Sequence, residues 1–178
     1  LIKVTADNAE DMAKQAGLDF DIIKKPLKFE DSNQNDIQIP DKVAIMRTDT
    51  DQYLGTVGID YGIVQYSKML DFTEILVAGK DAEYVSARAI GNGERATVVM
   101  KTNDRIYISD EDVIECYFHV NTSHDMSVSL DVITSPLRRI NGTILMQPND
   151  RSRTKFRHTK NVLDRLTRAK NSITEVRH

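Results

Sequence analysis

Apolar and polar residues alternate through the middle of the chain with the period of two that is typical of β-strands. Every second residue is apolar from Ile114 to Val120, and the same alternation returns from Val128 to Val132. A polar stretch, residues 121–126, separates the two runs. The pattern predicts two strands joined into a long hairpin.

Two further pairs of β-prone runs flank short turns. Residues 83–90 and 95–102 bracket a Gly-Asn-Gly-Glu sequence that begins at Gly91. Glycine and asparagine at this place favour a tight hairpin turn. Residues 43–49 and 53–59 flank a second polar turn in the same way. The sequence therefore predicts a series of antiparallel hairpins.

Helical signals precede and interrupt these strands. The sequence Asp7-Asn8-Ala9-Glu10 matches an N-cap with an acidic partner three residues later, and Gly17 is a good residue to end a helix, so a short helix is expected over residues 8–16. Apolar residues among good helix formers predict a second helix over residues 61–78, with Gly79 directly after it.

The end of the chain predicts an amphipathic helix. Its apolar stripe has spacings of four and three residues and consists of Val162, Leu166, Ala169, Ile173 and Val176. Arg165, Arg168 and Lys170 lie off the stripe. We expect one face to pack on the protein and the other to be basic.

These elements predict an α+β fold, in which antiparallel hairpins pack with flanking helices. A chain of 178 residues suits one domain. We divide it into an N-terminal helix and loop extension (1–42), a β-rich core with one helix (43–137), and a basic segment with the C-terminal helix (138–178). Polar residues and Pro40 give residues 30–41 the composition of a mobile loop.

Charge divides the chain unevenly. Residues 1–137 contain 13 lysines and arginines against 24 aspartates and glutamates, whereas residues 138–178 contain 11 against 3. The first part is thus at −11 and the second at +8, which the overall charge of −3 conceals. Such asymmetry indicates a polyanionic partner, of which nucleic acid is the first candidate. A solvated basic helix with a mobile tail is the simpler interpretation.

The candidate nucleic-acid-binding residues are cations and one aromatic residue among them. They are Arg138, Arg139, Arg151, Arg153, Lys155, Phe156, Arg157, Lys160, Arg165 and Arg168. Arginine forks suit phosphate, and an aromatic ring such as that of Phe156 can stack on a base. No helix-turn-helix or zinc-finger pattern is present, so we expect binding without sequence preference.

Other chemistry has less support. The glycine-rich phosphate loops and the nucleophile elbow of hydrolases are missing from the sequence. Cys116 lies in an alternating strand, where an inert thiol is expected. His119, His124, Asp125 and His158 form a metal set only if the fold brings them together, and their spacing matches no known zinc motif. We therefore expect no enzyme activity and no cofactor.

A set of short motifs resembles the phage/plasmid-like protein family of uncharacterised function. The motifs, in order, are Arg47-x-Asp49-Thr50-x2-Tyr53-Leu54-Gly55-x-Val57-Gly58-x2-Tyr61-x2-Val64-Gln65, Gly91-x-Gly93, Asn121-x-Ser123-His124-Asp125, Ser135-Pro136-Leu137-Arg138 and Arg157-His158-Thr159. The chain departs from the family at Met126, where a glycine is usual, and over residues 140–144.

The order of the elements is similar to that of the Rad-fifty-two-like single-strand annealing proteins, which include the RecT, Erf and Red beta types. This second resemblance implies rings or filaments that hold single-stranded DNA in a basic groove. It is an analogy of fold alone.

Our leading hypothesis is a single-stranded DNA-binding and strand-annealing protein of a phage or plasmid recombination system. It would form a homo-oligomer, a ring or a filament, in which the acidic part of one subunit meets the basic part of the next. The alternatives are a structural or protein-interaction subunit that docks an acidic partner and, third, a metal-dependent nuclease or hydrolase. No apolar run is long enough to span a bilayer. We expect no membrane contact and a place in the cytoplasm of a bacterial host cell.

Overall fold

The structure is a computed structural model. It describes residues 2–3, 6, 8–78, 82–140, 143–146 and 152–176, and every structural statement below concerns these residues.

A large antiparallel sheet forms the body of the described structure. Along it lie β1 (Ile2–Lys3), β5 (Ala82–Ile90), β6 (Arg95–Ser109), β7 (Asp112–Ser123), β8 (Leu130–Ile140) and β10 (Ser152–Phe156), and β9 (Thr143–Met146) also pairs with β8. The hairpins predicted around Gly91 and around residues 121–126 are confirmed as β5–β6 and β7–β8. β6 and β7 extend further, into a hairpin that the sequence did not indicate.

A smaller sheet contains β2 (Ile22–Glu30), β3 (Asp36–Arg47) and β4 (Tyr53–Gly58). The β3–β4 hairpin was predicted, but the prediction of a loop over residues 30–41 is wrong. The end of β2 and the beginning of β3 pair there, with Phe29 opposite Ile37. Most residues of this hairpin are exposed, so the strands show no alternation between buried apolar and exposed polar positions.

Three helices complete the described elements: α1 (Ala9–Ala16), α2 (Tyr66–Ala78) and α3 (Val162–Val176). The end of α1 at Gly17 is confirmed, because Gly17 is left-handed with φ 67°. The N-cap is Asn8, one residue later than predicted, and its side chain accepts a hydrogen bond from the Asp11 N–H. The second helix begins at Tyr66, five residues later than predicted. Gly79 lies outside the described residues.

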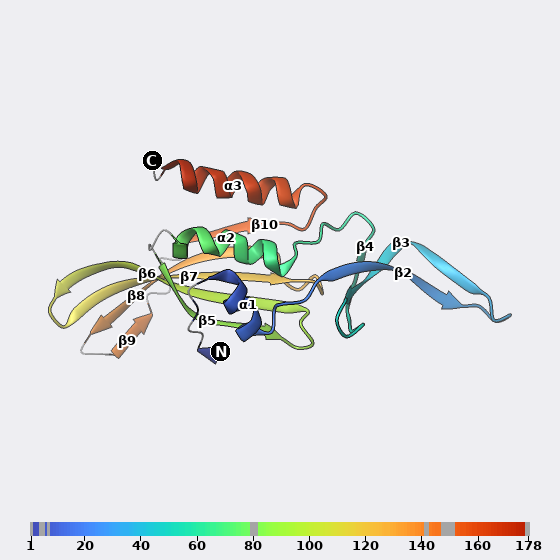
Figure 1. Ribbon diagram of the computed structural model, residues 1–178, viewed down its shortest axis with the longest axis horizontal. Helices are drawn as coiled ribbons and strands as arrows, with labels where there is room; N and C mark the ends of the chain where they lie inside the picture. The colour runs from blue at the N-terminus through green and yellow to red at the C-terminus, as the bar shows by residue number, and fades with distance from the viewer. Residues whose placement is uncertain are drawn as a thin grey trace.

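The hydrophobic core lies between the helices and one face of the large sheet. Strand alternation directs Val98, Val120 and Leu130 to this face, where each is fully or almost fully buried. The α3 stripe contributes Val162 and Leu166. Figure 1 shows α2 and α3 on the same side of the sheet, and the fold class predicted from the sequence is thus confirmed.

Two hairpins give the molecule its long axis. Figure 1 shows the β2–β3 hairpin at one end, in light blue, and the β6–β7 hairpin at the opposite end, in yellow-green. None of the described helices combines the length and the apolar character that a bilayer crossing requires.

Candidate functional site

Four of the predicted DNA-binding cations are paired with carboxylates of the same chain. The pairs are Arg138 with Asp112 at 2.5 Å, Arg139 with Glu115 at 3.2 Å, Lys160 with Asp60 at 2.6 Å, and Arg153 with Asp131. All four carboxylates come from the acidic part of the chain. The charge division seen in the sequence is therefore partly neutralised within one molecule.

The physical surroundings of these pairs differ. Asp112 accepts two hydrogen bonds from the Arg138 guanidinium, and these bonds hold the pKa of Asp112 below its ordinary value. Asp131 is buried, and it also accepts a hydrogen bond from the Ser129 hydroxyl. Asp60 and Lys160 are both more than 70% exposed. Only this last pair lies in water, where an ion pair contributes little.

The remaining predicted residues fall into three groups. Lys155, Arg157 and Arg165 are exposed and have no ion pair with another described residue. Arg168 is exposed as well. Phe156 is only 7% exposed and belongs to the core, so its ring offers no face to a base. Arg151 lies outside the described residues.

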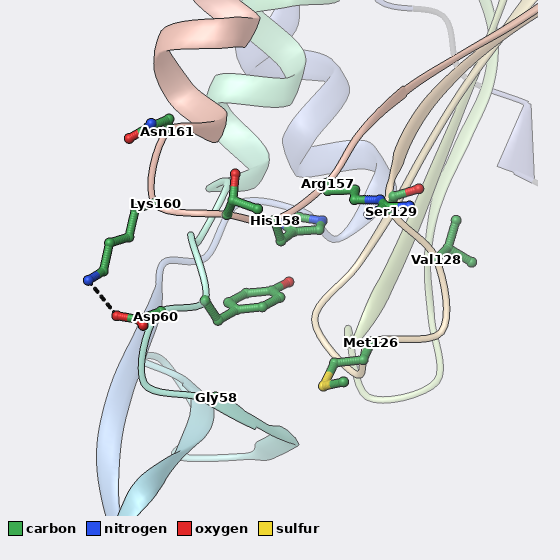
Figure 2. Close-up of a pocket in the computed structure, with 11 residues that line it drawn as sticks. Gly58, Asp60, Met126, Val128, Ser129, Arg157, His158, Lys160 and Asn161 are labelled. Atoms are coloured by element: carbon green, nitrogen blue, oxygen red, sulfur yellow. Dashed lines mark ion pairs between the residues drawn. The ribbon is translucent and has the colours of Figure 1, made fainter.

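Lys155 and Arg157 lead along the edge strand β10 to a cleft of about 730 Å³. Three connections line this cleft, namely residues 58–61 after β4, residues 126–129 between β7 and β8, and residues 157–161 between β10 and α3. Figure 2 shows the Asp60–Lys160 ion pair at one side of the cleft, with Met126 and Arg157 on the other.

The floor of the cleft is a pair of stacked rings, each of which is hydrogen-bonded to other groups of the protein. Tyr61 stacks on His158, with ring centroids 4.8 Å apart and an interplanar angle of 10°. The Tyr61 hydroxyl donates to the Ser123 carbonyl at 2.8 Å. His158 Nδ1 lies 3.0 Å from the Gly62 carbonyl, to which it can donate, and Nε2 lies 3.2 Å from the Thr122 hydroxyl. These bonds tie the connections after β4 and after β10 to each other and to the end of β7, from which the third connection leaves.

His124 lies beneath this pair and is fully buried. Its ring contacts those of Tyr66 and His158 at centroid distances of 5.1 and 5.9 Å. Burial, together with the neighbouring His158, lowers the pKa of His124 to about 3, so the ring is neutral at physiological pH. Its Nε2 has no hydrogen-bond partner among the described residues.

Glycines allow the three connections to approach so closely. A Cβ at Gly55 would lie 2.8 Å from the His124 carbonyl oxygen and 2.9 Å from the Asp125 Cα. A Cβ at Gly62 would overlap the Thr159 carbonyl oxygen and lie 2.8 Å from Val162 Cγ1. Backbone and packed side chains cannot give way easily, so only glycine fits at these two positions.

The four candidate metal ligands do not meet. His124 and His158 are neighbours, but Asp125 pairs with Arg95 at 3.7 Å, and His119 lies further along β7, opposite Val99 and Ile133. No group of three or more histidines, cysteines or carboxylates within the described residues is arranged to hold a metal ion. Cys116 is half-buried on β7.

Sequence reasoning weighed His124 and His158 as metal ligands and missed their shared role as the floor of the cleft. The signal was nevertheless present, because Tyr61, Ser123 and His158 belong to three separate motifs that carry the family resemblance. The structure brings these motifs to one place.

A known protein family matches the part of the chain that contains the cleft. A family model described as a domain of unknown function, DUF932, matches residues 53–178. The chain belongs to the DUF932 family. The matched range contains all three connections that line the cleft, whereas α1 and the β2–β3 hairpin precede it. No curated protein and no solved structure matches the chain.

Membership of DUF932 confirms the resemblance to a family of uncharacterised function. The phage or plasmid setting and the likeness to strand-annealing proteins stay predictions.

Proposed function

We propose that this DUF932 protein binds single-stranded DNA without sequence preference and promotes the annealing of complementary strands in phage or plasmid recombination. The observation that supports the proposal is that two cations without ion pairs lead directly to the cleft. Lys155 and Arg157 have no ion pair within the described residues, and Arg157 lines the cleft at the meeting point of the family motifs.

The spacing of these cations suits a backbone of repeated phosphates. Residues two apart on a strand lie on the same face and are about 6.6 Å apart, at about 3.3 Å per residue. Lys155 lies on the edge strand, on the face opposite the buried Phe156, and Arg157 continues the chain directly after the strand ends. Cations placed in this way can follow a phosphate backbone with no contact to base edges.

The cleft supplies a place for a base. Tyr61, Met126 and Val128 line it, and Met126 is 63% exposed. A base can stack against an aromatic ring or rest on apolar side chains whatever its identity, which gives binding without sequence preference. The hydrogen-bonding groups of Tyr61 and His158 are already occupied within the protein.

The test is the anisotropy of a labelled mixed-sequence single strand, titrated with protein from about 50 to 300 mM salt. Each phosphate contact contributes about 0.7 to the salt slope for a single strand. The double variant Lys155→Gln/Arg157→Gln should thus lower the slope by about 1.4 and weaken binding at low salt by tenfold or more. The same variants are then compared in an annealing assay with complementary strands.

Arg88→Gln is the matched control. Arg88 is exposed on β5, at a distance of several strands from β10, and has no ion pair within the described residues. It should bind DNA as the wild type does. A decrease of about 0.7 in the salt slope for Arg88→Gln, half that of the double variant, would assign binding to overall charge and not to the cleft. If the wild type fails to bind at the lowest salt, the protein-interaction alternative replaces this proposal.

A further inference from the structure

Met126, in the connection between β7 and β8, has a backbone conformation that few apolar residues adopt. Its φ is 66°, in the left-handed region, where any residue with a Cβ meets a steric cost and glycine does not. Within the described residues, Gln34 and Asp51 are the other non-glycine residues with positive φ. Both are exposed polar residues in connections between strands, so Met126 is the apolar exception.

The side chain of Met126 gains little in return for this strain. It is 63% exposed, whereas Met12, Met69 and Met100 are fully buried in the core. Glycine at this position would avoid both the strained backbone and the exposed apolar group. The fold therefore gives no reason for a methionine here, and backbone strain without a structural return is typical of ligand sites.

The connection fixes Met126 from both sides. Asp125 Oδ1 accepts a hydrogen bond from the Ser127 N–H at 2.9 Å. The Ser123 hydroxyl donates to the Val128 carbonyl at 2.8 Å and accepts from the Val128 N–H at 2.9 Å. These bonds close the chain around Met126, and a left-handed residue persists where its surroundings determine it in this way.

The fixed connection presents the Met126 side chain to the cleft. Figure 2 shows the side chain extending from the connection toward Gly58, which lines the same cleft. Gly58 leaves this space open, since even a Cβ there would meet nothing within 4 Å. The cleft thus has an apolar wall at Met126 beside the aromatic ring of Tyr61, and the exposed cation Arg157 lies at its edge.

We propose that Met126 holds one unpaired base of a DNA strand in the cleft, and that this contact makes the protein prefer a single strand to a duplex. The inference rests on the proposed function. An unpaired base can enter the cleft and lie against the thioether and the Tyr61 ring, while its phosphate stays beside Arg157. The bases of a duplex are paired and stacked, and to extrude one costs free energy.

The test uses the variant Met126→Gly and three labelled probes, with binding measured by anisotropy. The probes are a mixed-sequence single strand, a strand of equal length in which every nucleotide is abasic, and the matched duplex. The variant should bind the normal single strand about three- to tenfold more weakly than the wild type does. Its affinities for the abasic strand and the duplex should be unchanged, because neither offers an unpaired base. Met126→Leu keeps an apolar side chain and should retain single-strand binding.

Gln34→Gly is the matched control. Gln34 is also left-handed, with φ 64°, and is exposed in the connection between β2 and β3, outside the cleft. This control should bind all three probes as the wild type does. Because glycine adopts the left-handed conformation freely, both glycine variants should unfold at the same urea concentration as the wild type or at a higher one.

Three results would overturn the proposal and leave the proposed function in place. They are undiminished binding of the normal strand by Met126→Gly, an equal loss on the normal and the abasic strand, and unfolding of Met126→Gly at a lower urea concentration than the wild type. The last result would make Met126 a structural residue. A wild type that binds none of the probes at low salt would instead remove the proposed function itself, and this inference with it.

Discussion

The floor and the rim of the cleft differ in every physical respect, although they lie within one site. The floor consists of Tyr61 and His158, which are half-buried and hydrogen-bonded to backbone and side-chain groups, and His124 is buried beneath them. The rim consists of Lys160 and Arg157, which are charged and exposed. Tyr61, His124 and His158 of the floor region and Arg157 of the rim all belong to the motifs that carry the family resemblance, but only the rim has groups able to attract a polyanion.

The floor and the rim therefore have separate roles in the molecule. A neutral, buried floor fixes the relative positions of three connections and has little charge to offer a ligand. An exposed rim contributes little to stability, since side chains in water gain little from their contacts. Changes in the floor should therefore alter the stability of the fold, and changes on the rim should alter binding.

The largest effect is expected at Gly62. Gly62→Ala places a methyl group against the Thr159 carbonyl and Val162, and it disturbs the hydrogen bonds that join Gly62 to His158. We expect a loss of roughly 2–4 kcal/mol in the free energy of unfolding. Urea denaturation measures it. Gly58→Ala is the matched control, because a Cβ there meets nothing within 4 Å; equal stability of the two variants would contradict the proposed role of the floor.

The next effect concerns acid stability. The unfolded chain protonates His124 near its ordinary pKa of 6.5, whereas the folded protein resists protonation down to about pH 3. Stability is therefore fully present above pH 6.5 and falls as the pH decreases from there, by about 1.4 kcal/mol per pH unit. Burial lowers the pKa of His158 too, which adds in the same direction.

Denaturant unfolding of the wild type at pH 7 and pH 5 should thus differ by about 2 kcal/mol or more. In His124→Asn the difference between the two pH values should shrink, whatever the stability of the variant at pH 7. An unchanged difference would show that His124 is accessible to protons in the folded state.

The smallest effect is expected at the ion pair on the rim. Asp60→Asn releases Lys160 from its partner, and because both side chains are more than 70% exposed, the free energy of unfolding should change by about 0.5 kcal/mol or less. If the rim binds phosphate, the released cation should add about 0.7 to the salt slope for single-stranded DNA. An unaltered slope would place Lys160 away from the path of the strand.

Periodic patterns made most of the fold readable from the sequence. The alternation around Val120 and the Gly91 turn predicted the two central hairpins, and the stripe from Val162 predicted α3. The outer part of the β2–β3 hairpin could not be predicted, because its strands are exposed on both faces and resemble a polar loop in composition. Patterns of burial indicate strands only where one face is covered.

The electrostatics of the site depend on register, which the sequence does not reveal. Arg138 meets Asp112 because β7 and β8 pair antiparallel, with Ile114 opposite Arg138. Phe156 seemed to belong with the cations around it, but alternation on β10 turns its ring to the core. A run of charge in a sequence therefore overstates the charge available to a partner.

The order of strands in the large sheet also bears on how the chain folds. From β5 to β8 each strand pairs with the next one along the chain, in antiparallel register. Each addition closes only a short loop, which costs little entropy and favours rapid folding. Synthesis proceeds from the N-terminus, so β6, β7 and β8 each emerge from the ribosome after the strand with which they pair.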